Sequence, residues 1–258
     1  MKAMPEGISG NSTRFSWGGK NAVRRAMNVL FDLDGTLTDP REGILACFKY
    51  ALDELQVESP ADRTLEGMIG PPLRESFTAL LGVDDEARID RAISLYRERF
   101  SLKGLYENAL YPGISEALVL LREMGCTLFV ATSKPHVFAQ RIIDYFKLGE
   151  FFRAVHGSEL DGSNADKTKL IAHVLRAESL TPTETIMIGD RAHDVVGAKV
   201  NSVVPIGVLW GYGSRQELAM AGADLLCEEP RMLVEAVSLI DDAQPCVSVP
   251  SPVGRRLG

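Results

Sequence analysis

The fold is decided by the stretch VLFDLDGTLTD, which spans residues 29–39. It begins as a short apolar strand and passes directly into two carboxylates, Asp32 and Asp34, followed by Gly35. Because burying acids inside an apolar sheet is costly, we expect them at the carboxyl end of the strand, where open α/β sheets bind ligands. Gly35 permits a tight turn and lets backbone N–H groups approach a ligand. Two adjacent carboxylates favour Mg²⁺, although DxDG strings also occur in calcium loops and ordinary turns.

Strand-like and helix-like segments alternate through most of the chain. Apolar runs bounded by small or turn residues occur at 28–31, 127–131, 153–156, 185–188, 203–208 and, more weakly, 223–226. Between most of them, apolar residues recur at three- and four-residue spacing, at 114–123, 137–146, 167–176, 192–200 and 215–221. This alternation predicts an α/β fold, a doubly wound parallel sheet with helices on both faces.

The segment from Asp39 to about Leu110 breaks this alternation, because it holds no convincing strand. Helical spacing recurs there, at 42–55, 73–81 and 86–100. About 70 residues are too many for a crossover loop between two strands. We therefore predict a small all-helical domain, residues 40–110, inserted after the first strand of a core formed by residues 27–39 and 111–240.

The two ends of the chain differ from the rest in composition. Residues 1–26 are polar and rich in Gly, Ser and Asn, and residues 241–258 are rich in Pro and Ser. We expect a disordered leader at one end and a flexible tail at the other. A true start at Met27 and an organelle transit peptide are alternatives for the leader.

Overall composition limits the partners and the compartment. The formal net charge is −7 and the leader is basic, so the remainder is more acidic still. An acidic body argues against binding to nucleic acid polymers or anionic membranes. No stretch approaches the roughly 18 apolar residues of a membrane span. Four widely spaced cysteines without metal-ligand spacing fit a reducing cytoplasm.

Three further segments place polar groups where a predicted strand ends or a helix begins. Thr132 and Ser133 follow one strand, and their hydroxyls suit phosphoryl oxygens or, more plainly, the start of a helix. Lys167 precedes a helix, where a lone lysine is usually solvated. Asp190 and Asp194 follow another strand, in a pattern that fits a cation site or an ordinary helix N-terminus. Taken together, polar groups at three strand ends of one sheet predict a site at their shared edge.

The order of these segments resembles that of the haloacid dehalogenase-like (HAD) phosphohydrolases over about residues 28–240. The resemblance rests on FDLDGTLTD at 31–39, VATSK at 130–134, Lys167, and IGDRAHD at 188–194. Two longer sequence segments, ATSKPHVFAQRI and GSELDG, look like those of the phosphoglycolate phosphatase-like branch, which includes 5′-nucleotidases. The resemblance implies a Rossmann-like core with a helical cap, and a Mg²⁺-dependent phosphatase that acts on a small phosphorylated metabolite.

The same resemblance assigns roles to the catalytic residues. Asp32 attacks phosphorus to form an aspartyl-phosphate, and Asp34 gives a proton to the leaving alkoxide and later takes one from water. Asp34 then needs a raised pKa. Thr132 and Lys167 bind the phosphoryl oxygens as charge redistributes.

The remaining family positions hold metal and substrate. The metal ligands are Asp32, the backbone carbonyl of Asp34, Asp190 and, through water or by orienting the others, Asp194. For these acids to serve one ion, Asp190 must lie within about 10 Å of Asp32. Substrate contacts are assigned to Gly35, Ser133 and Lys134.

The predicted cap and the surroundings of the motifs carry weaker signals. Arg74 follows a stiff Gly-Pro-Pro turn, and we expect it to face the substrate and bind a carboxylate or a second anionic group. The alternative is a solvated arginine after an ordinary turn between helices. The Arg91, Arg97 and Arg99 run alternates with Glu98 and is most simply a solvated helix face. His193 is more simply a helix-surface residue than a base.

Several functions remain open on the same site. A phosphatase for a small, phosphoglycolate-like ester is the leading interpretation, and a 5′-nucleotidase, a pyrophosphatase or a sugar phosphomutase would use the same aspartates. A non-enzymatic alternative is an interaction module that binds phosphate or metal. The second aspartate speaks against that module, because binding alone needs no proton donor.

Overall fold

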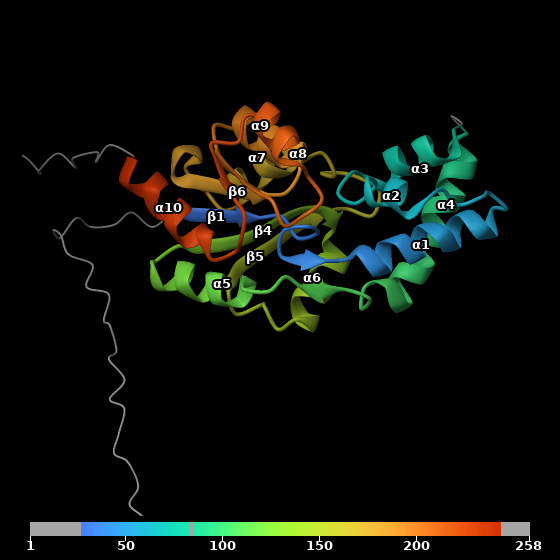
Figure 1. The fold of residues 1–258 in the computed structure, drawn as a ribbon, viewed down its shortest axis with the longest axis horizontal. Helices are drawn as coiled ribbons and strands as arrows, with labels where there is room; N and C mark the ends of the chain where they lie inside the picture. Colours follow the sequence, from blue (N-terminus) through green and yellow to red (C-terminus); the bar gives the residue numbers. More distant parts are fainter. Residues whose placement is uncertain (1–26, 83–84, 244–258) are drawn as a thin grey trace, which may run out of the picture.

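The computed structural model describes residues 27–82 and 85–243. The predicted leader, residues 1–26, lies outside the described residues, as does the tail from 244 onward. Within the described ranges the chain forms a sheet covered by helices, with a second group of helices beyond one end of the sheet (Figure 1).

Within the described part of the chain, the main sheet has six strands, and all of its pairings are parallel. In spatial order the strands are β5 (Phe152–Ser158), β4 (Thr127–Pro135), β1 (Asn28–Phe31), β6 (Thr185–Gly189), β7 (Val204–Val208) and β8 (Leu225–Cys227). Each lies on an apolar run that the sequence identifies, with bounds shifted by a few residues. Parallel pairing brings the carboxyl ends of β4, β1 and β6 to one edge, so the polar segments that follow them meet there.

Helices cover both faces of this sheet, which confirms the doubly wound α/β fold (Figure 1). One face packs on α7 (Lys167–Ala177) and α8 (Ala192–Val200), around a small core that includes Leu30, Phe129 and Met187. The opposite face packs on the following helices: α5 (Ile114–Glu123), α6 (His136–Tyr145) and α10 (Met232–Ala243). Alternate residues of β1 enter the two clusters, because successive strand side chains point to opposite faces.

Shorter elements complete the core. The helix α9 (Arg215–Ala221) follows β7, and the turn η2 (Pro182–Glu184) precedes β6. The sequence predicts that the tail begins at Asp241, but α10 continues to Ala243, because its apolar face packs on the sheet through Leu233 and Val237. The helical period therefore runs past the point where composition changes.

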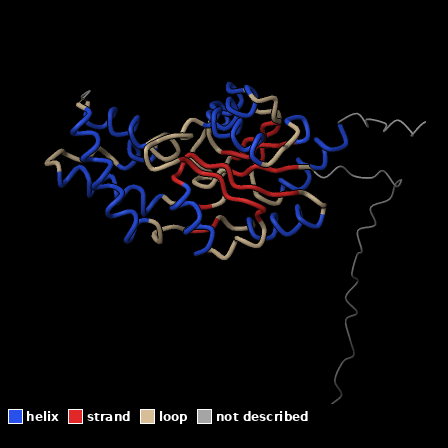
Figure 2. Tube along the Cα trace, turned by 180° about the vertical axis from the view of Figure 1, so that it is seen from behind, coloured by secondary structure: helices blue, strands red, loops and turns tan. Residues whose placement is uncertain are grey.

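A second group of helices follows β1, in the segment where the sequence predicts the cap. Its elements are α1 (Arg41–Glu54), α2 (Asp62–Glu66), α3 (Leu73–Leu81), α4 (Glu86–Arg99) and the π-helical turn η1 (Phe100–Gly104). Figure 2 shows these helices grouped beyond the end of the sheet and joined to it through loops. Their interior is aromatic, since Phe48 and Tyr96 pack at a ring-centroid distance of 5.0 Å, with Phe77 and Phe100 against them.

A two-stranded antiparallel ribbon joins the cap to the core. It pairs β2 (Thr38–Asp39) with β3 (Ala109–Leu110), where the chain leaves the core and where it returns. The sequence shows no strand at these positions, because two residues are too few for a period to appear. The ribbon holds the two connections side by side.

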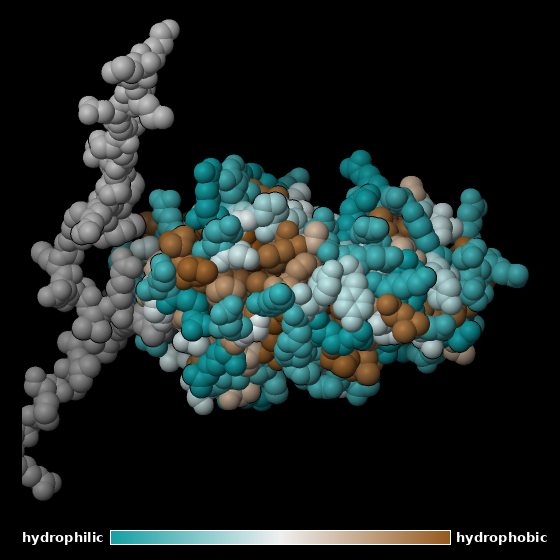
Figure 3. Space-filling model, turned by 90° about the horizontal axis from the view of Figure 1, so that it is seen from below, coloured by the Kyte–Doolittle hydropathy of each residue, from teal (hydrophilic) through white to brown (hydrophobic). Residues whose placement is uncertain are grey.

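The surface seen from below in Figure 3 mixes hydrophilic and hydrophobic side chains rather than separating them into one large apolar area. Large apolar side chains exposed on α5 and α6 include Val119, Leu120 and Val137. Among the described residues, none of the helices combines the length and apolar character that a bilayer crossing requires.

Candidate active site

The nucleophile position, Asp32, lies directly after β1. Its backbone N–H donates to the carbonyl of Ile188 at 2.9 Å, which continues the ladder between β1 and β6. Its carboxylate accepts from the backbone N–H of Leu33 at 2.7 Å, and the residue is 3% exposed. Burial raises the pKa of Asp32, and the neighbouring Lys167 opposes that rise. The carboxylate is thus held rigidly at the sheet edge.

Lys167 is fully enclosed by oxygen atoms rather than solvated. It is the first residue of α7, after Asp166 caps the helix, so its side chain points back toward the sheet edge. Its Nζ lies 3.0 Å from Asp32 Oδ1 and 2.8 Å from Asp194 Oδ1, and it donates to the carbonyl of Ala131 at 2.9 Å. Burial opposes the charged form, but the two carboxylates outweigh it and raise the pKa of Lys167.

Asp190 lies after β6 and is held by the loop after β1 and by the loop after β7. Its Oδ1 accepts from the hydroxyl of Thr36 at 3.2 Å, and its Oδ2 accepts from the backbone N–H of Tyr212 at 2.8 Å. Gly35 has φ +84° and packs so closely that an added Cβ would lie 2.3 Å from Asp190 Oδ2. Only glycine tolerates both that backbone angle and that contact. Burial raises the pKa of Asp190 well above its usual value, and the nearby Asp194 and Asp32 add to the rise.

Asp194 closes the arrangement from the first turn of α8. Its Oδ2 accepts from the backbone N–H of Arg191 at 3.1 Å, and a Cβ on Gly189 would meet its carboxylate carbon at 2.3 Å. Burial alone would raise the pKa of Asp194, but Lys167, His193 and the Arg191 N–H together outweigh it and lower the pKa. The charged form of Asp194 is therefore favoured inside the fold.

The charges of this cluster fit a divalent cation. Three buried carboxylates, Asp32, Asp190 and Asp194, face one buried ammonium, Lys167, so a further positive charge would favour the ionised form of all three acids. One atom from each of Asp32, His193 and Asp194 lies within 4.8 Å of the others. The oxygen donors suit a hard cation such as Mg²⁺.

The strand β4 supplies the other predicted polar residues. Thr132 is buried, and its hydroxyl accepts from the backbone N–H of Lys134 at 3.3 Å, while the Ser133 carbonyl accepts from Ser158 at 2.8 Å. Lys134 Nζ lies 2.7 Å from Asp34 Oδ2 and 4.4 Å from the centre of the Phe100 ring. The other carboxylate oxygen of Asp34 is buried without a hydrogen-bond partner. The structure thus holds Asp34 apart from the Asp32–Lys167–Asp194 cluster, with one oxygen available for a new partner.

A cavity of about 770 Å³ joins this edge to the cap. Asp34, Ser133 and Lys134 line its core end, while Asp32 is not part of the lining. Its cap end is formed by α1, α3 and α4 and includes the rings of Phe48, Tyr96 and Phe100.

Arg74 lines this cavity, as predicted, but its guanidinium is already paired. It contacts Glu86 and also Asp90, the latter at 2.5 Å, and its side chain is 49% exposed. The prediction that Arg74 meets a substrate anion therefore lacks a free cation at that position. The physical reason is that α4 presents two acids to α3, a contact between helices that periodicity within one helix does not show.

The sequence also misjudged two residues, and it did not name the loop partner of Asp190. His193 is half-buried with its Nε2 enclosed, and it lies against Gly70 of the cap. Arg97 lines the cavity instead of a solvated face. Residues 210–213 contribute the Tyr212 N–H to Asp190, a backbone contact that no side-chain motif signals.

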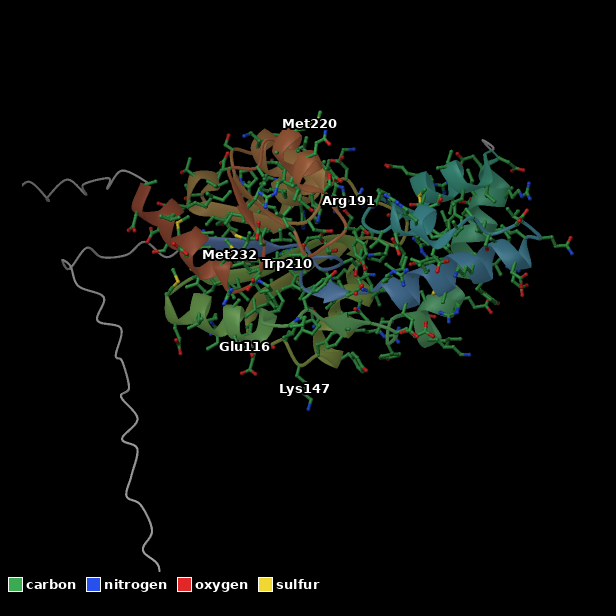
Figure 4. All side chains as sticks on the ribbon, viewed as in Figure 1. Glu116, Lys147, Arg191, Trp210, Met220 and Met232 are labelled. Carbon is green, nitrogen blue, oxygen red and sulfur yellow. The ribbon has the colours of Figure 1, made fainter. Side chains whose placement is uncertain are left out.

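Arg191 links the core to the cap loop that precedes α3. Arg191 donates from its guanidinium to the carbonyl of Ile69 at 2.6 Å, and Glu217 accepts from the same group at 3.0 Å. Figure 4 shows Arg191 on the side of the core toward the cap helices. The cap loop is thus tied to the segment that carries Asp190 and Asp194.

Comparison with known proteins agrees with this geometry. A family model described as haloacid dehalogenase-like hydrolase matches residues 29–208. A 5′-nucleotidase of Pseudomonas aeruginosa is 50% identical over 77% of this chain and 90% of its own length. The tyrosine-protein kinase PtkA of Mycobacterium tuberculosis is 35% identical over 86% of this chain and 72% of its own length. A crystal structure of a "predicted phosphatase" from Clostridium acetobutylicum superposes with TM-score 0.80 at 40% identity, covering 83% of this chain and 99% of that one. The chain belongs to the haloacid dehalogenase-like hydrolases and is a phosphoric monoester hydrolase of that family.

Proposed function

We propose that this protein is a Mg²⁺-dependent 5′-nucleotidase. The observation that carries the proposal is the cavity of about 770 Å³, whose cap end includes the half-buried apolar side chains Met68, Pro71 and Leu73 and which suits a nucleoside better than a two-carbon acid. The 50% identical relative named 5′-nucleotidase supports the same substrate class.

The cavity also argues against the phosphoglycolate-like ester that the sequence favours. Arg74, the cation that the sequence predicts for the carboxylate of that substrate, is taken up by Glu86 and Asp90. Acidic residues outnumber basic ones two to one among the charged residues that line the cavity. A second anionic group on the substrate would meet this field at a cost.

In the proposed mechanism, Asp32 attacks the phosphoryl group and forms an aspartyl-phosphate, releasing the nucleoside 5′-oxygen. Asp34 donates a proton to that oxygen and then accepts one from the water that cleaves the acyl-phosphate. The unpartnered oxygen of Asp34 at the cavity wall suits this exchange. Lys167 and Thr132 stabilise the phosphoryl oxygens.

Asp32, Asp190, Asp194 and the backbone carbonyl of Asp34 would hold Mg²⁺. When bound, the ion supplies the positive charge that offsets repulsion between the phosphate dianion and the nucleophile. Lys167 keeps Asp32 and Asp194 in place, and the cap excludes bulk water during attack.

The test is phosphate release from a panel of esters, with Mg²⁺ and with a chelator. The panel includes nucleoside 5′-monophosphates, phosphoglycolate, pyrophosphate, glucose 6-phosphate and p-nitrophenyl phosphate. We expect kcat/KM for at least one nucleotide to exceed that for phosphoglycolate by about ten-fold or more. Highest turnover of phosphoglycolate would overturn the nucleotide assignment.

Two further readouts separate the remaining alternatives. A phosphomutase needs a bisphosphate activator, and a kinase passes the phosphoryl group to an acceptor other than water, so free phosphate without either argues for the hydrolase. In the chelated protein, Mg²⁺ alone should raise the melting temperature, because binding only the folded state stabilises it. The Asp190→Asn variant should lose that rise, and an unchanged rise would remove Asp190 from the metal site.

A further inference from the structure

The cap brings two arginines to the cavity, and they differ in their partners. Arg74 is paired with two carboxylates of α4. The side chain of Arg97 has no ion pair or hydrogen bond among those found for residues 27–82 and 85–243, and its Nε is buried. A buried donor left without a partner carries a desolvation cost, which a ligand acceptor would remove.

Arg97 belongs to the face of α4 that lines the cavity. Asp90, Ile93, Ser94 and Arg97 all line it, and they recur at three- and four-residue spacing. Burial lowers the pKa of Arg97, and the neighbouring Arg74 adds to that effect. The guanidinium nonetheless keeps its charge at neutral pH and offers up to five N–H donors in a fixed plane.

The surroundings of Arg97 favour an uncharged, flat acceptor over a second anion. The acidic residues of the lining include Glu75, Asp90 and Glu159, which repel an additional phosphate or carboxylate. Half-buried apolar side chains in the cap part of the lining, Met68, Pro71 and Leu73, offer apolar surface to a planar ring. A nucleobase with carbonyl and ring-nitrogen acceptors meets both conditions.

We propose that Arg97 recognises the base of the substrate by donating two N–H groups to adjacent acceptors, and so selects 6-oxopurine nucleotides. This proposal rests on the proposed nucleotidase function. Hypoxanthine and guanine present O6 beside N7, which matches the guanidinium fork. Adenine presents an amino donor beside N7, so one N–H would face another donor. The neutral base also avoids the acids of the cavity.

The experiment compares kcat and KM for IMP, GMP, AMP and p-nitrophenyl phosphate in the full-length protein with Mg²⁺. The variants are Arg97→Met, Arg97→Lys and, as a matched control, Arg91→Met, an exposed arginine of the same helix outside the cavity. We expect the parent protein to prefer IMP and GMP over AMP by about ten-fold or more. Arg97→Met should remove this preference mainly through KM.

Substrates without a base separate recognition from folding. Turnover of p-nitrophenyl phosphate and the melting temperature should stay within about two-fold and a few degrees of the parent in all three variants, because Arg97 gives up no ion pair. Arg97→Lys should recover only part of the preference, since an ammonium lacks the planar fork.

Three results would overturn the proposal: a parent protein that prefers AMP, an Arg97→Met variant that keeps the preference, or an equal loss on every substrate including p-nitrophenyl phosphate. Each leaves the nucleotidase function standing as long as some nucleotide is hydrolysed. Absence of nucleotide hydrolysis in the parent protein, with p-nitrophenyl phosphate still turned over, would instead defeat the proposed function.

Discussion

At the catalytic edge of the core, charged side chains are buried against one another, whereas the charged side chains that the cap contributes to the cavity are exposed or half-buried. Lys167 and its two carboxylate partners are at most 5% exposed at their side chains, while Arg74 is 49% exposed. Electrostatic interactions strengthen as water is excluded, so the core can fix a reaction geometry that the cap cannot. Under the proposed function, we therefore expect the core to determine the chemistry and the cap to determine the substrate.

Substitution of the proposed nucleophile, Asp32, should have the largest effect on activity and tests the role of the core. Asp32→Asn removes the attacking oxygen while leaving its volume unchanged, so we expect phosphate release to fall by at least about a thousand-fold. Initial rates on p-nitrophenyl phosphate and on a nucleotide measure the loss. Asp53→Asn, an exposed change on α1, is the control and should keep full activity. Near-parental turnover by Asp32→Asn would remove Asp32 as the nucleophile.

Lys167 tests whether buried charges in the core depend on one another. Lys167→Met leaves Asp32 and Asp194 without their shared cation, and breaking such a buried pair costs about 3–5 kcal/mol. We expect the free energy of unfolding in urea to fall by that amount and activity to fall by about a hundred-fold.

Lys169→Met is the matched control for this change, because Lys169 lies on the same helix and is exposed. It should shift the free energy of unfolding by no more than about 0.5 kcal/mol. Equal stability of the two variants would show that the Lys167 ammonium is not compensated by the carboxylates as described.

The backbone around Asp190 gives a smaller, more local test. Gly35→Ala would put a methyl group 2.3 Å from Asp190 Oδ2 at φ +84°, so the carboxylate must move. Disturbing a residue that holds a metal ligand in place typically lowers metal affinity or activity by about 10–100-fold. Gly82→Ala is the control, since Gly82 has φ +62° with open space around its Cβ position and should show backbone strain of about 1 kcal/mol alone. Similar Mg²⁺ dependence of the rate in both variants would contradict the close packing at Asp190.

The same division between core and cap explains what the sequence could predict. The strands β1 and β6 and the helices α3, α5, α8 and α9 were predicted to within one residue, because period and apolar runs act locally. Asp32, Asp190 and Asp194 could be placed together because parallel strands bring their carboxyl ends to one edge, whereas Lys167 joined them only through the family resemblance. Their chemical roles stay predictions.

Contacts between elements could not be predicted in the same way. A helical period shows which side chains share a face, but not that Glu86 and Asp90 would pair with Arg74 and leave Arg97 without a partner. The two-residue strands of the ribbon and the π-helical turn at Phe100–Gly104 are too short to give a period. His193 became half-buried through the cap loop at Gly70, a tertiary contact.

The smallest expected effect concerns His156 in the core, because its contact with Glu178 only partly compensates the cost of burying its charged form. Burial lowers the pKa of His156 below its ordinary 6.5, and this outweighs the 3.0 Å contact with Glu178, which raises it. The unfolded chain therefore takes up a proton before the folded chain does, so stability holds above about pH 6.5 and falls as the pH drops below it. The urea midpoint of the parent protein should consequently fall more between pH 7.5 and pH 5.5 than that of His156→Gln.

The exposed neighbour His173, at a ring-centroid distance of 5.9 Å, provides the control: His173→Gln should follow the parent. Equal losses in the parent and in His156→Gln would show that the contact with Glu178 compensates burial here as fully as the carboxylates do at Lys167.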